Sequence, residues 1–511
     1  MEGRRSGGLA GYSGPLSTRY RSAKRRGPAI ADLDQSKAPY FDALSQYVGA
    51  EHLTFHIPGH QHGSAFSPEL RDLLISKGAA ADITEVLGID DIHNPHRQVK
   101  EAEELAAAAF GARATKFLVN GSTVGNQAML TATLGPADLV LAPRSVHRSF
   151  FSGLLLSGAR VELFATDVHP ELGCHLPPTA EQVKAAIESF PEARALFLTS
   201  PIYQGACAPL IEIVALAKER GLIVLVDEAW GAHLHFSPQL PDSAVDAGAD
   251  MVVHSLHKSA GGLTPSAVLH FDPGRVNRGR LETVLRHLQT SSPSSLLVAS
   301  IDCARRQLAL SGEADWGRAA GLAARAQVEV GALDGFSCFE KRSPDWDPTK
   351  VSIEATAHGY TGHDLARTLR WEHKVQVEMS EASHLLLAFS PGHTESHLDK
   401  LLHALSSLPP GPGLPACFQR ESPPIPIVSP KVTVRQAFHA RSKMLDLRKA
   451  VDQTCAELLY CYPPGVPVVF PGQPLTVEVV EFIETQLALG GCVLGGVDPD
   501  LETVLVLEER E

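Results

Sequence analysis

The sequence predicts an α/β protein whose main sheet has seven mostly parallel strands. Between about residue 97 and residue 271, short apolar segments rich in β-branched residues alternate with helical stretches. This alternation is typical of βαβ units, in which helices cover both faces of a parallel sheet. The segments are almost continuously apolar, as expected of strands that are buried on both faces.

The elements of this region follow one another in a regular order. A helix rich in alanine and glutamate is predicted over 97–110, ahead of the sheet. The strands are predicted at 116–119, 139–142, 161–165, 195–199, 223–227, 251–255 and 266–271. A helix over 294–310 follows the last strand. We assign these elements, with an N-terminal arm, to a major domain over 31–315.

Two further domains are predicted after the major domain. A small α/β domain over 316–407 shows the order strand, helix, strand, helix, at 351–355, 361–369, 385–388 and 394–405. The segment 408–430 is rich in proline, which fixes φ and removes a backbone donor, so we predict an extended linker. A C-terminal α+β domain over 431–511 is expected to contain a helix near 448–459.

Charge and composition disfavour several classes of protein. The formal net charge of -13 argues against a general nucleic-acid or anionic-membrane binder. No apolar run has the length that a transmembrane helix needs. The eight cysteines form no CxxC pair, which argues against a zinc site and a disulfide framework. This cysteine usage favours a reducing compartment, and we expect a cytoplasmic protein.

The N-terminal segment 1–30 breaks the acidic trend. Residues 1–26 carry seven arginines and lysines against one acidic residue, together with several serines and glycines. A disordered basic tail has this composition. A transit segment for a plastid or another organelle has it too, and the sequence leaves both interpretations open.

Two residues at strand ends carry the strongest functional signal. Asp227 ends one predicted strand, and Lys258 lies just past the end of another. In an open α/β sheet, ligands bind beyond the carboxyl ends of the strands, so both side chains are expected to face one crevice. A desolvated lysine that forms a Schiff base and a carboxylate that keeps a pyridine nitrogen protonated are what pyridoxal 5'-phosphate (PLP) needs. The pair predicts a PLP site without a metal ion.

Other groups fit the same cofactor. Gly121, Ser122 and Thr123 open a helix, where hydroxyls and the helix N-terminus could bind a phosphate; an ordinary helix cap is the alternative. His147 follows the second strand and could stack on the pyridine ring or be a loop histidine. Ser255 and His257 share one strand face if the strand runs that far, and they would then reach phosphate and substrate. Ordinary packing at a strand end is the alternative.

Ten short motifs are spread over most of the chain. They are FHIPGH at 55–60, DITE at 82–85, GIDDIHNP at 88–95, VNGST at 119–123, TSPIY at 199–203, DEAWGAH at 227–233, HSLHK at 254–258, TSSPSS at 290–295, YPPG at 462–465 and PG at 471–472. With these motifs in family order, the chain resembles the bacterial-type ornithine/lysine/arginine decarboxylases from about Pro39 to about Val506.

The resemblance implies a PLP enzyme with an aspartate-aminotransferase-like fold, in the short form that lacks an N-terminal regulatory domain. Lys258 would carry the cofactor, and Asp227 would pair with the pyridine nitrogen. His147 would stack on the ring, and Ala229 would pack beneath it. The phosphate or the substrate would be bound by Ser122, Thr123, Ser255 and His257.

The implied reaction is decarboxylation of arginine, lysine or ornithine, which gives agmatine or a diamine for polyamine metabolism. Lys258 or His257 would return a proton to the Cα. The stretches 290–295 and 82–85 would lie near a subunit interface, so a homodimer or a larger homo-oligomer is implied. A carboxylate should pair with the far cation of the substrate. The candidates are Glu85, Asp90, Asp91 and Glu378.

Departures from the family pattern leave the substrate open. Gln61 stands where a lysine is frequent, Pro265 follows Leu-Thr in place of glutamine, and residues 96 and 97 replace a small turn. One alternative is another PLP reaction on this fold, by an aminotransferase with Arg367 or Arg370 as carboxylate clamp, or by a lyase. A non-catalytic regulatory homologue is the other.

Overall fold

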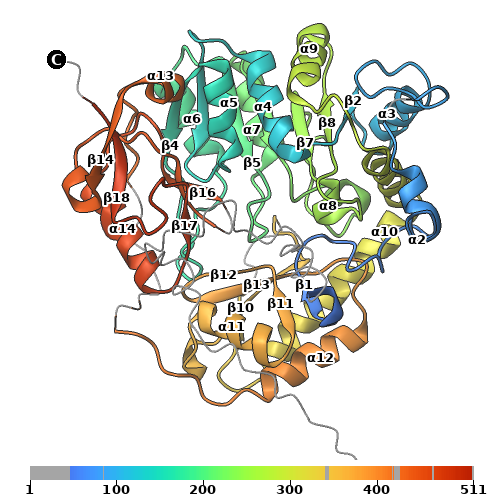
Figure 1. Cartoon of the computed structure of the whole chain (residues 1–511), viewed down its shortest axis with the longest axis vertical. Coiled ribbons are helices and arrows are strands. Elements are labelled where there is room, and N and C mark those ends of the chain that lie inside the picture. Colours follow the sequence, from blue (N-terminus) through green and yellow to red (C-terminus); the bar gives the residue numbers. More distant parts are fainter. Residues whose placement is uncertain are drawn as a thin grey trace, which may run out of the picture.

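Three groups of elements follow one another along the chain: a seven-stranded sheet with its helices, a four-stranded sheet, and a C-terminal group (Figure 1). The computed structural model describes residues 47–508, except 85, 340–344, 417, 419–425 and 463–464. The basic segment predicted over 1–30 lies outside the described residues. The division into domains stays a prediction.

The main sheet has the strand order β2-β8-β7-β6-β5-β3-β4. Neighbouring strands are parallel, except that β8 is antiparallel to both β2 and β7. All seven predicted strands are confirmed to within one residue at either end, because uninterrupted apolar segments mark them. They are β2 (Thr115–Leu118), β3 (Leu139–Pro143), β4 (Arg160–Phe164), β5 (Ala195–Thr199), β6 (Ile223–Asp227), β7 (Met251–His254) and β8 (Ala267–Phe271).

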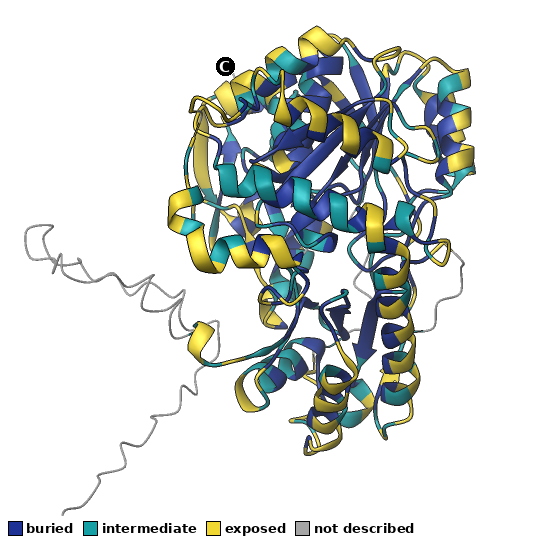
Figure 2. Ribbon diagram, turned by 90° about the vertical axis from the view of Figure 1, so that its right-hand side faces the viewer, coloured by how far each residue is buried: buried dark blue, intermediate teal, exposed yellow. Residues whose placement is uncertain are grey.

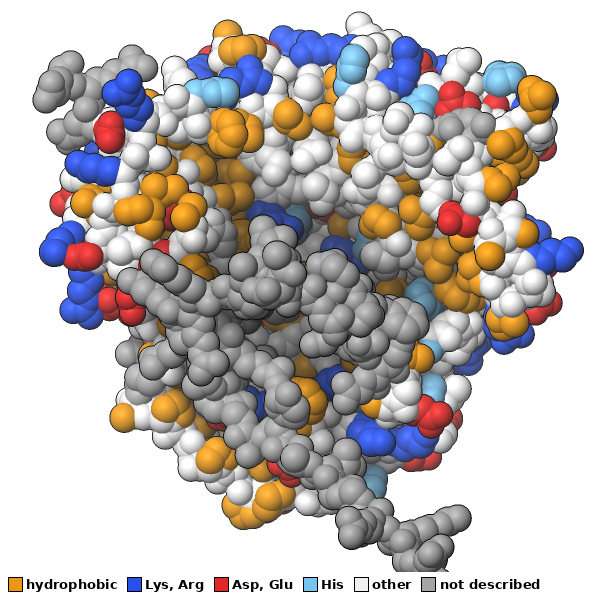
Figure 3. All heavy atoms as spheres, viewed as in Figure 1, with side chains coloured by type: hydrophobic (Ala, Val, Ile, Leu, Met, Phe, Trp, Pro, Cys, Tyr) orange, Lys and Arg blue, Asp and Glu red, His pale blue; other side chains and the backbone are white. Residues whose placement is uncertain are grey.

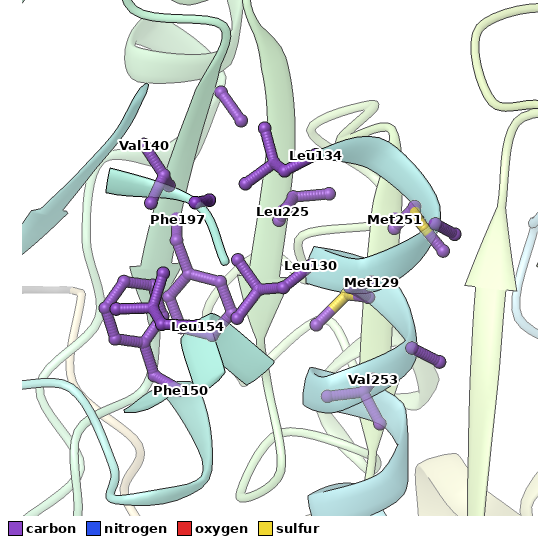
Figure 4. Close-up of a cluster of buried hydrophobic side chains, with 14 of the residues drawn as sticks. Met129, Leu130, Leu134, Val140, Phe150, Leu154, Phe197, Leu225, Met251 and Val253 are labelled. Carbon is purple, nitrogen blue, oxygen red and sulfur yellow. The ribbon is translucent and has the colours of Figure 1, made fainter. Parts of the chain in front are cut away.

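Helices cover both faces of this sheet. Its strands are therefore buried, as their dark blue colour in Figure 2 shows. Side chains alternate between the faces: Phe197 packs in the cluster shown in Figure 4, whereas Leu196 and Leu198 pack on the opposite side. One face carries α4 (Gly121–Thr133), α5 (Ser149–Ser157) and α9 (Arg278–Leu288). The other carries α3 (Gln98–Ala109), α6 (Ala180–Ser189) and α7 (Leu210–Glu219).

The helix predicted over 294–310 is longer than expected. As α10 (Ser295–Gly331), it runs without a break past the serine and glycine at 311 and 312. Gly312 packs against Phe236, and a Cβ there would lie 2.8 Å from that side chain, so close packing accounts for this glycine. Beyond it, Trp316, Ala323 and Val330 are buried at a spacing that keeps one helix face apolar.

The small sheet has the order β12-β13-β10-β9, and all its pairs are antiparallel. The predicted order of strand, helix, strand, helix is confirmed. The arm before the main sheet joins this region, because β1 (Leu53–Phe55) pairs in parallel with β11 (Val375–Val377). The elements are β9 (Ser337–Cys338), β10 (Lys350–Glu354), α11 (Gly362–Glu372), β12 (Met379–Ser380), β13 (His384–Ala388) and α12 (Glu395–Ser406).

The C-terminal group combines two small sheets with two helices. The helix predicted near 448–459 is wrong: a 3-10 helix over Leu447–Ala450 is followed by Asp452 at φ +66 and by extended chain. Cys455 there forms a β-bridge with Val506, a tertiary contact that overrides local helix propensity. The elements are α13 (Val434–His439), β14 (Ser442–Asp446), β15 (Leu459–Cys461), β16 (Val466–Val469), α14 (Val477–Ala488), β17 (Val493–Leu494) and β18 (Thr503–Leu507).

The described residues of 408–430 form no helix or strand. No described helix has the length and apolar character to cross a membrane. On the face shown in Figure 3, acidic and basic side chains are interspersed over the surface.

Candidate active site

A cavity of about 530 Å³ opens at the carboxyl ends of the parallel strands. Its lining comes from the loops after β2, β3, β5, β6 and β7, from the turn after β12, and from the C-terminal group. This is the place where ligands bind in open α/β sheets. The residues predicted for the site all line it: Gly121, Ser122, Thr123, His147, Asp227, Ala229, Ser255, His257 and Lys258.

Asp227 is held in a fixed orientation at the base of the cavity. Asn126 on α4 donates through Nδ2 to Asp227 Oδ2 at 2.6 Å, and the Ala229 N–H donates to Oδ1 at 3.1 Å. Burial raises the pKa of Asp227, and the Lys258 ammonium and these donors oppose that rise. Asn126 was not predicted from the sequence, although a polar side chain on the buried face of a helix is a signal that could have found it.

His147 is joined to this network. Its Nδ1 shares a hydrogen bond of 2.8 Å with the Ser149 hydroxyl, which also accepts from Asn126 Nδ2 at 2.8 Å. Burial, helped by the charges of Lys258 and Arg148, lowers the pKa of His147 to about 3, so its ring is neutral. A neutral, oriented imidazole can stack on a flat aromatic ligand.

The C-terminal group reaches the same histidine. Gly465 in the YPPG motif takes a φ of +92, and a Cβ there would lie 3.1 Å from the His147 ring. The Arg148 N–H donates to the Gly465 carbonyl at 3.0 Å. Gly465, near the end of the chain, therefore packs directly against the site.

The start of α4 offers an anion-binding end to the cavity. Gly121 takes a φ of +73 at its first residue, and no side chain caps the N-terminus of this helix. The Ser122 hydroxyl hydrogen-bonds the Ser255 hydroxyl at 2.6 Å beside it. Free N–H groups, the helix dipole and paired hydroxyls are what a phosphate needs.

Lys258 lies in the short helix α8 (Leu256–Ser259), which follows β7. The condition under which Ser255 and His257 would share a strand face is not met, since β7 ends at His254. Both residues still line the cavity, because the helical turn aims them there. Burial lowers the pKa of Lys258, as an amine poised for nucleophilic attack requires.

The FHIPGH motif packs on the backbone of this turn. The Gly59 N–H donates to the His257 carbonyl at 3.0 Å, and a Cβ on Gly59 would lie 2.5 Å from the Lys258 carbonyl oxygen. No other residue fits at this position without a backbone shift. Gln61 donates through Nε2 to the His56 carbonyl at 3.0 Å and accepts from the Thr54 hydroxyl, so it holds the arm in place. Pro265 lines the cavity beside Gly121.

The carboxylates that were predicted as partners for the substrate's far cation lie in different parts of the structure. Asp90 accepts from the N–H groups at the start of α3, and Asp91 accepts from the His93 N–H; neither lines the cavity. Glu85 lies outside the described residues. Glu378 accepts from the Tyr203 hydroxyl at 2.5 Å and from the Ile57 N–H at 2.7 Å. Burial lowers the pKa of Lys258, and the Glu378 carboxylate opposes that effect.

Glu381, in the turn after β12, is an acidic residue of the cavity that the sequence reasoning missed. Its Oε1 accepts from Gln204 Nε2 at 3.1 Å, and burial raises its pKa to about 7. Cys174 and Cys461 line the cavity with it. The sequence shows no motif and no predicted strand end at this turn. The fold alone therefore brings Glu381 to the site.

The arginines considered as an aminotransferase clamp lie elsewhere. Arg367 pairs with Asp364 at 2.9 Å, and the Arg370 guanidinium lies 5.0 Å from the Tyr47 ring centroid. Neither lines the cavity.

Two family models match the chain. The model described as "Orn/Lys/Arg decarboxylase, major domain" covers residues 38–346, and the model of the C-terminal domain covers 414–502. An arginine decarboxylase of Halalkalibacterium halodurans is 36% identical over 93% of this chain and 99% of its own length. One of Bacillus subtilis is 34% identical over 94% and 99%.

Solved structures show the same fold. Lysine decarboxylase A from Pseudomonas aeruginosa has a TM-score of 0.71 at 19% identity, and the match covers 92% of this chain and 80% of that one. The constitutive lysine decarboxylase of Escherichia coli has a TM-score of 0.70 at 19% identity, with 92% and 82% covered.

Proposed function

The chain belongs to the Orn/Lys/Arg decarboxylase family, the decarboxylases of basic amino acids, and we propose that its substrate is arginine and its cofactor PLP. One observation carries the cofactor assignment. A half-buried lysine, a buried aspartate and an uncapped helix N-terminus beside two hydroxyls meet in one cavity. These groups match the aldehyde, the pyridine nitrogen and the phosphate of PLP in turn.

Each part of the site has a distinct task in this proposal. PLP, when bound, supplies the electron sink for the pair of electrons that departing CO₂ leaves behind. Lys258 attaches the cofactor covalently, and Asp227 holds a proton on the pyridine nitrogen. The neutral His147 ring fixes the plane of the cofactor. Ser122, Ser255 and the first turn of α4 bind the phosphate.

The far end of the substrate is assigned to Glu381. Glu381 is half-buried, and its raised pKa indicates that its carboxyl lacks a full counter-charge; a cation that enters the cavity supplies one. A guanidinium can form two parallel hydrogen bonds with one carboxylate, which favours arginine over the point charge of lysine or ornithine. The names of the relatives that are 34–36% identical over almost the whole chain support the same substrate.

A product assay tests this function directly. Purified protein supplied with PLP is given arginine, lysine and ornithine in turn, and amine products and CO₂ are measured without any keto acid. We expect agmatine and CO₂ from arginine, with far lower rates for the other two. Faster release of a diamine from lysine or ornithine would refute the arginine assignment, and a requirement for a keto acid would refute decarboxylation.

We also propose that the protein is a homodimer, or an even-numbered assembly of dimers, through the segment before α3. Ile83 and Ser295 join the two stretches expected at an interface, since the Ile83 N–H donates to the Ser295 hydroxyl at 3.2 Å. Apolar side chains of this segment are unusually exposed. They are Ile75, Val86, Leu87 and Ile89. A second copy that covers them would bury an apolar patch.

A further inference from the structure

A buried lysine lies behind the wall of the proposed active site. Lys350, at the start of β10, is 3% exposed. Its Nζ lies 4.2 Å from the centroid of the Trp230 ring, and the Nζ of Lys258 lies 4.8 Å from the same centroid. Trp230 lines the cavity, whereas Lys350 does not. One indole ring thus lies beside two lysine amines, one from α8 after the main sheet strand β7 and one from β10 of the small sheet.

An ion pair favours the charged form of Lys350. Its Nζ lies 3.8 Å from Asp347 Oδ2. Asp347 accepts through Oδ1 from the Thr349 N–H and hydroxyl, at 2.9 and 2.7 Å, and its Oδ2 is 3.2 Å from His233 Nε2. These groups hold the pKa of Asp347 well below its usual range. Burial lowers the pKa of Lys350, and the Asp347 carboxylate opposes that effect.

The surrounding chain fixes the position of Lys350. Gly205 takes a φ of +103, and a Cβ there would lie 2.9 Å from Lys350 Cγ and 3.1 Å from Trp346 Nε1. The Asp347 N–H donates to the Gly205 carbonyl at 2.8 Å, which ties the turn before β10 to the loop after β5. Glycine is therefore needed at 205 to admit the lysine side chain.

We propose that Lys350 is a positioning residue for the reaction: its fixed positive charge against the Trp230 ring favours the neutral, reactive form of the Lys258 amine. This inference rests on the proposed function, because it assumes that Lys258 binds the cofactor. A like charge in a region of low dielectric disfavours a second cation. The charge comes from the small sheet, so the packing of that sheet against the turn after β7 would add to the reactivity of the Lys258 amine.

Other charged groups face the two amines and oppose or add to this effect. Asp227 and Glu378 favour the ammonium form of Lys258, whereas burial disfavours it. Lys350 is faced by Asp347, Glu378 and Cys207. His147 and His257 both have lowered pKa values and are neutral above about pH 4. Lys350 is thus the cation to remove in a test.

The test measures how fast PLP reloads the apoprotein as a function of pH. Full-length protein is freed of cofactor, mixed with PLP from pH 6 to pH 10.5, and followed by the visible absorbance of the bound cofactor. The rate follows the neutral fraction of the Lys258 amine, so its midpoint reports the pKa of that amine. We expect Lys350→Met to move this midpoint upward by on the order of one pH unit, the effect of a like charge beside the same indole ring in a protein interior.

Two further measurements make the result decisive. Lys350→Gln, which is neutral but polar, should give the same upward shift, and Lys116→Met should give none. Lys116 is a similarly buried lysine, and its Nζ lies 2.9 Å from Glu103 Oε2. Unlike Trp230 and Lys258, it does not line the cavity. The wild-type midpoint itself must lie below about 10.4, the ordinary pKa of lysine.

An unchanged midpoint in both Lys350 variants would overturn the inference, even if their stability falls. A wild-type midpoint at the ordinary value of lysine would overturn it without any variant. Failure of the proposed function is recognised separately, since wild-type protein would then develop no visible absorbance at any pH.

Discussion

At the scale of single residues, the site combines groups that the sequence marks with groups that only the fold reveals. Asp227 and Lys258 could be predicted because Asp227 ends one apolar strand and Lys258 lies just past another. The carboxyl ends of parallel strands share one edge of a sheet, so both side chains reach one cavity. Asn126 and Glu381 could not be predicted in this way, since one lies inside a helix and the other in a turn. Their side chains acquire roles only when distant segments meet.

Replacing Asp227 with asparagine tests the residue that is proposed to hold the pyridine proton. The variant should still bind PLP, because Asn126 and the lysine remain, but the electron sink weakens. We expect kcat to fall by about 10²–10³-fold, a typical loss for one preorganised electrostatic group. Absorbance spectra and steady-state kinetics check this, with the exposed Asp242→Asn as control. Turnover like that of the wild type would contradict the assignment.

Glu381 predicts a specific pH dependence. Its pKa in the free enzyme is raised to about 7, so the carboxyl is charged above that pH and neutral below it. Binding of a guanidinium needs the charged form, so kcat/KM for arginine should fall as the pH drops below about 7. Glu381→Gln should lose this pH dependence and lower kcat/KM at pH 8 by about 10–100-fold, the size of a lost charge-assisted hydrogen bond.

The control for this experiment is Glu372→Gln, an exposed change on α11. It should leave the pH profile intact. If Glu381→Gln keeps both the rate and the profile, then another group receives the far cation of the substrate.

At the scale of elements, local pattern predicts strands better than it predicts where helices end. The strands of the main sheet are marked by apolar residues alone. The predicted helix stops at 310, whereas α10 continues through Gly312, where a contact with Phe236 accounts for the glycine. The C-terminal helix was misplaced because the bridge of Cys455 to Val506 holds that segment extended. Each error falls where a tertiary contact overrides the local preference.

The arm that carries the FHIPGH motif gives a prediction at this scale. Gly59→Ala would place a Cβ 2.5 Å from the Lys258 carbonyl oxygen, so the arm or the lysine turn must move. Overpacking of this kind costs about 1–3 kcal/mol of unfolding free energy. We expect a lower Tm and faster loss of PLP on dialysis. Gly78→Ala, which meets no atom within 4 Å, is the matched control and should be neutral or slightly stabilising.

If Gly59→Ala keeps both the Tm and the cofactor of the wild type, the arm does not support the lysine turn as described.

At the scale of the whole molecule, the cavity draws on all three groups of elements. The main sheet supplies the residues proposed for the cofactor, the turn after β12 supplies Glu381, and Gly465 supports His147. A sequence pattern identifies each piece separately but does not say that they enclose one cavity. The resemblance to a family implies this assembly, and the structure gives its contacts.

The proposed dimer is testable through one exposed side chain. Leu87 is fully exposed in the single chain, so Leu87→Glu should not harm its fold. Within a dimer, the new charge would be buried against apolar surface, which is costly. We expect the wild type to be dimeric or larger by light scattering and Leu87→Glu to shift toward monomer. Phe438→Glu, at an exposed apolar residue outside this segment, should not shift toward monomer. A wild-type monomer would contradict the proposal.

The most direct test of the central claim identifies the residue that holds the cofactor. Wild-type protein loaded with PLP is reduced with borohydride and digested, and the peptides are sequenced by mass spectrometry. The account predicts one pyridoxyl-modified residue, Lys258, and no modification or visible absorbance in Lys258→Ala. A label on any other lysine, or a chromophore that survives in Lys258→Ala, would contradict it.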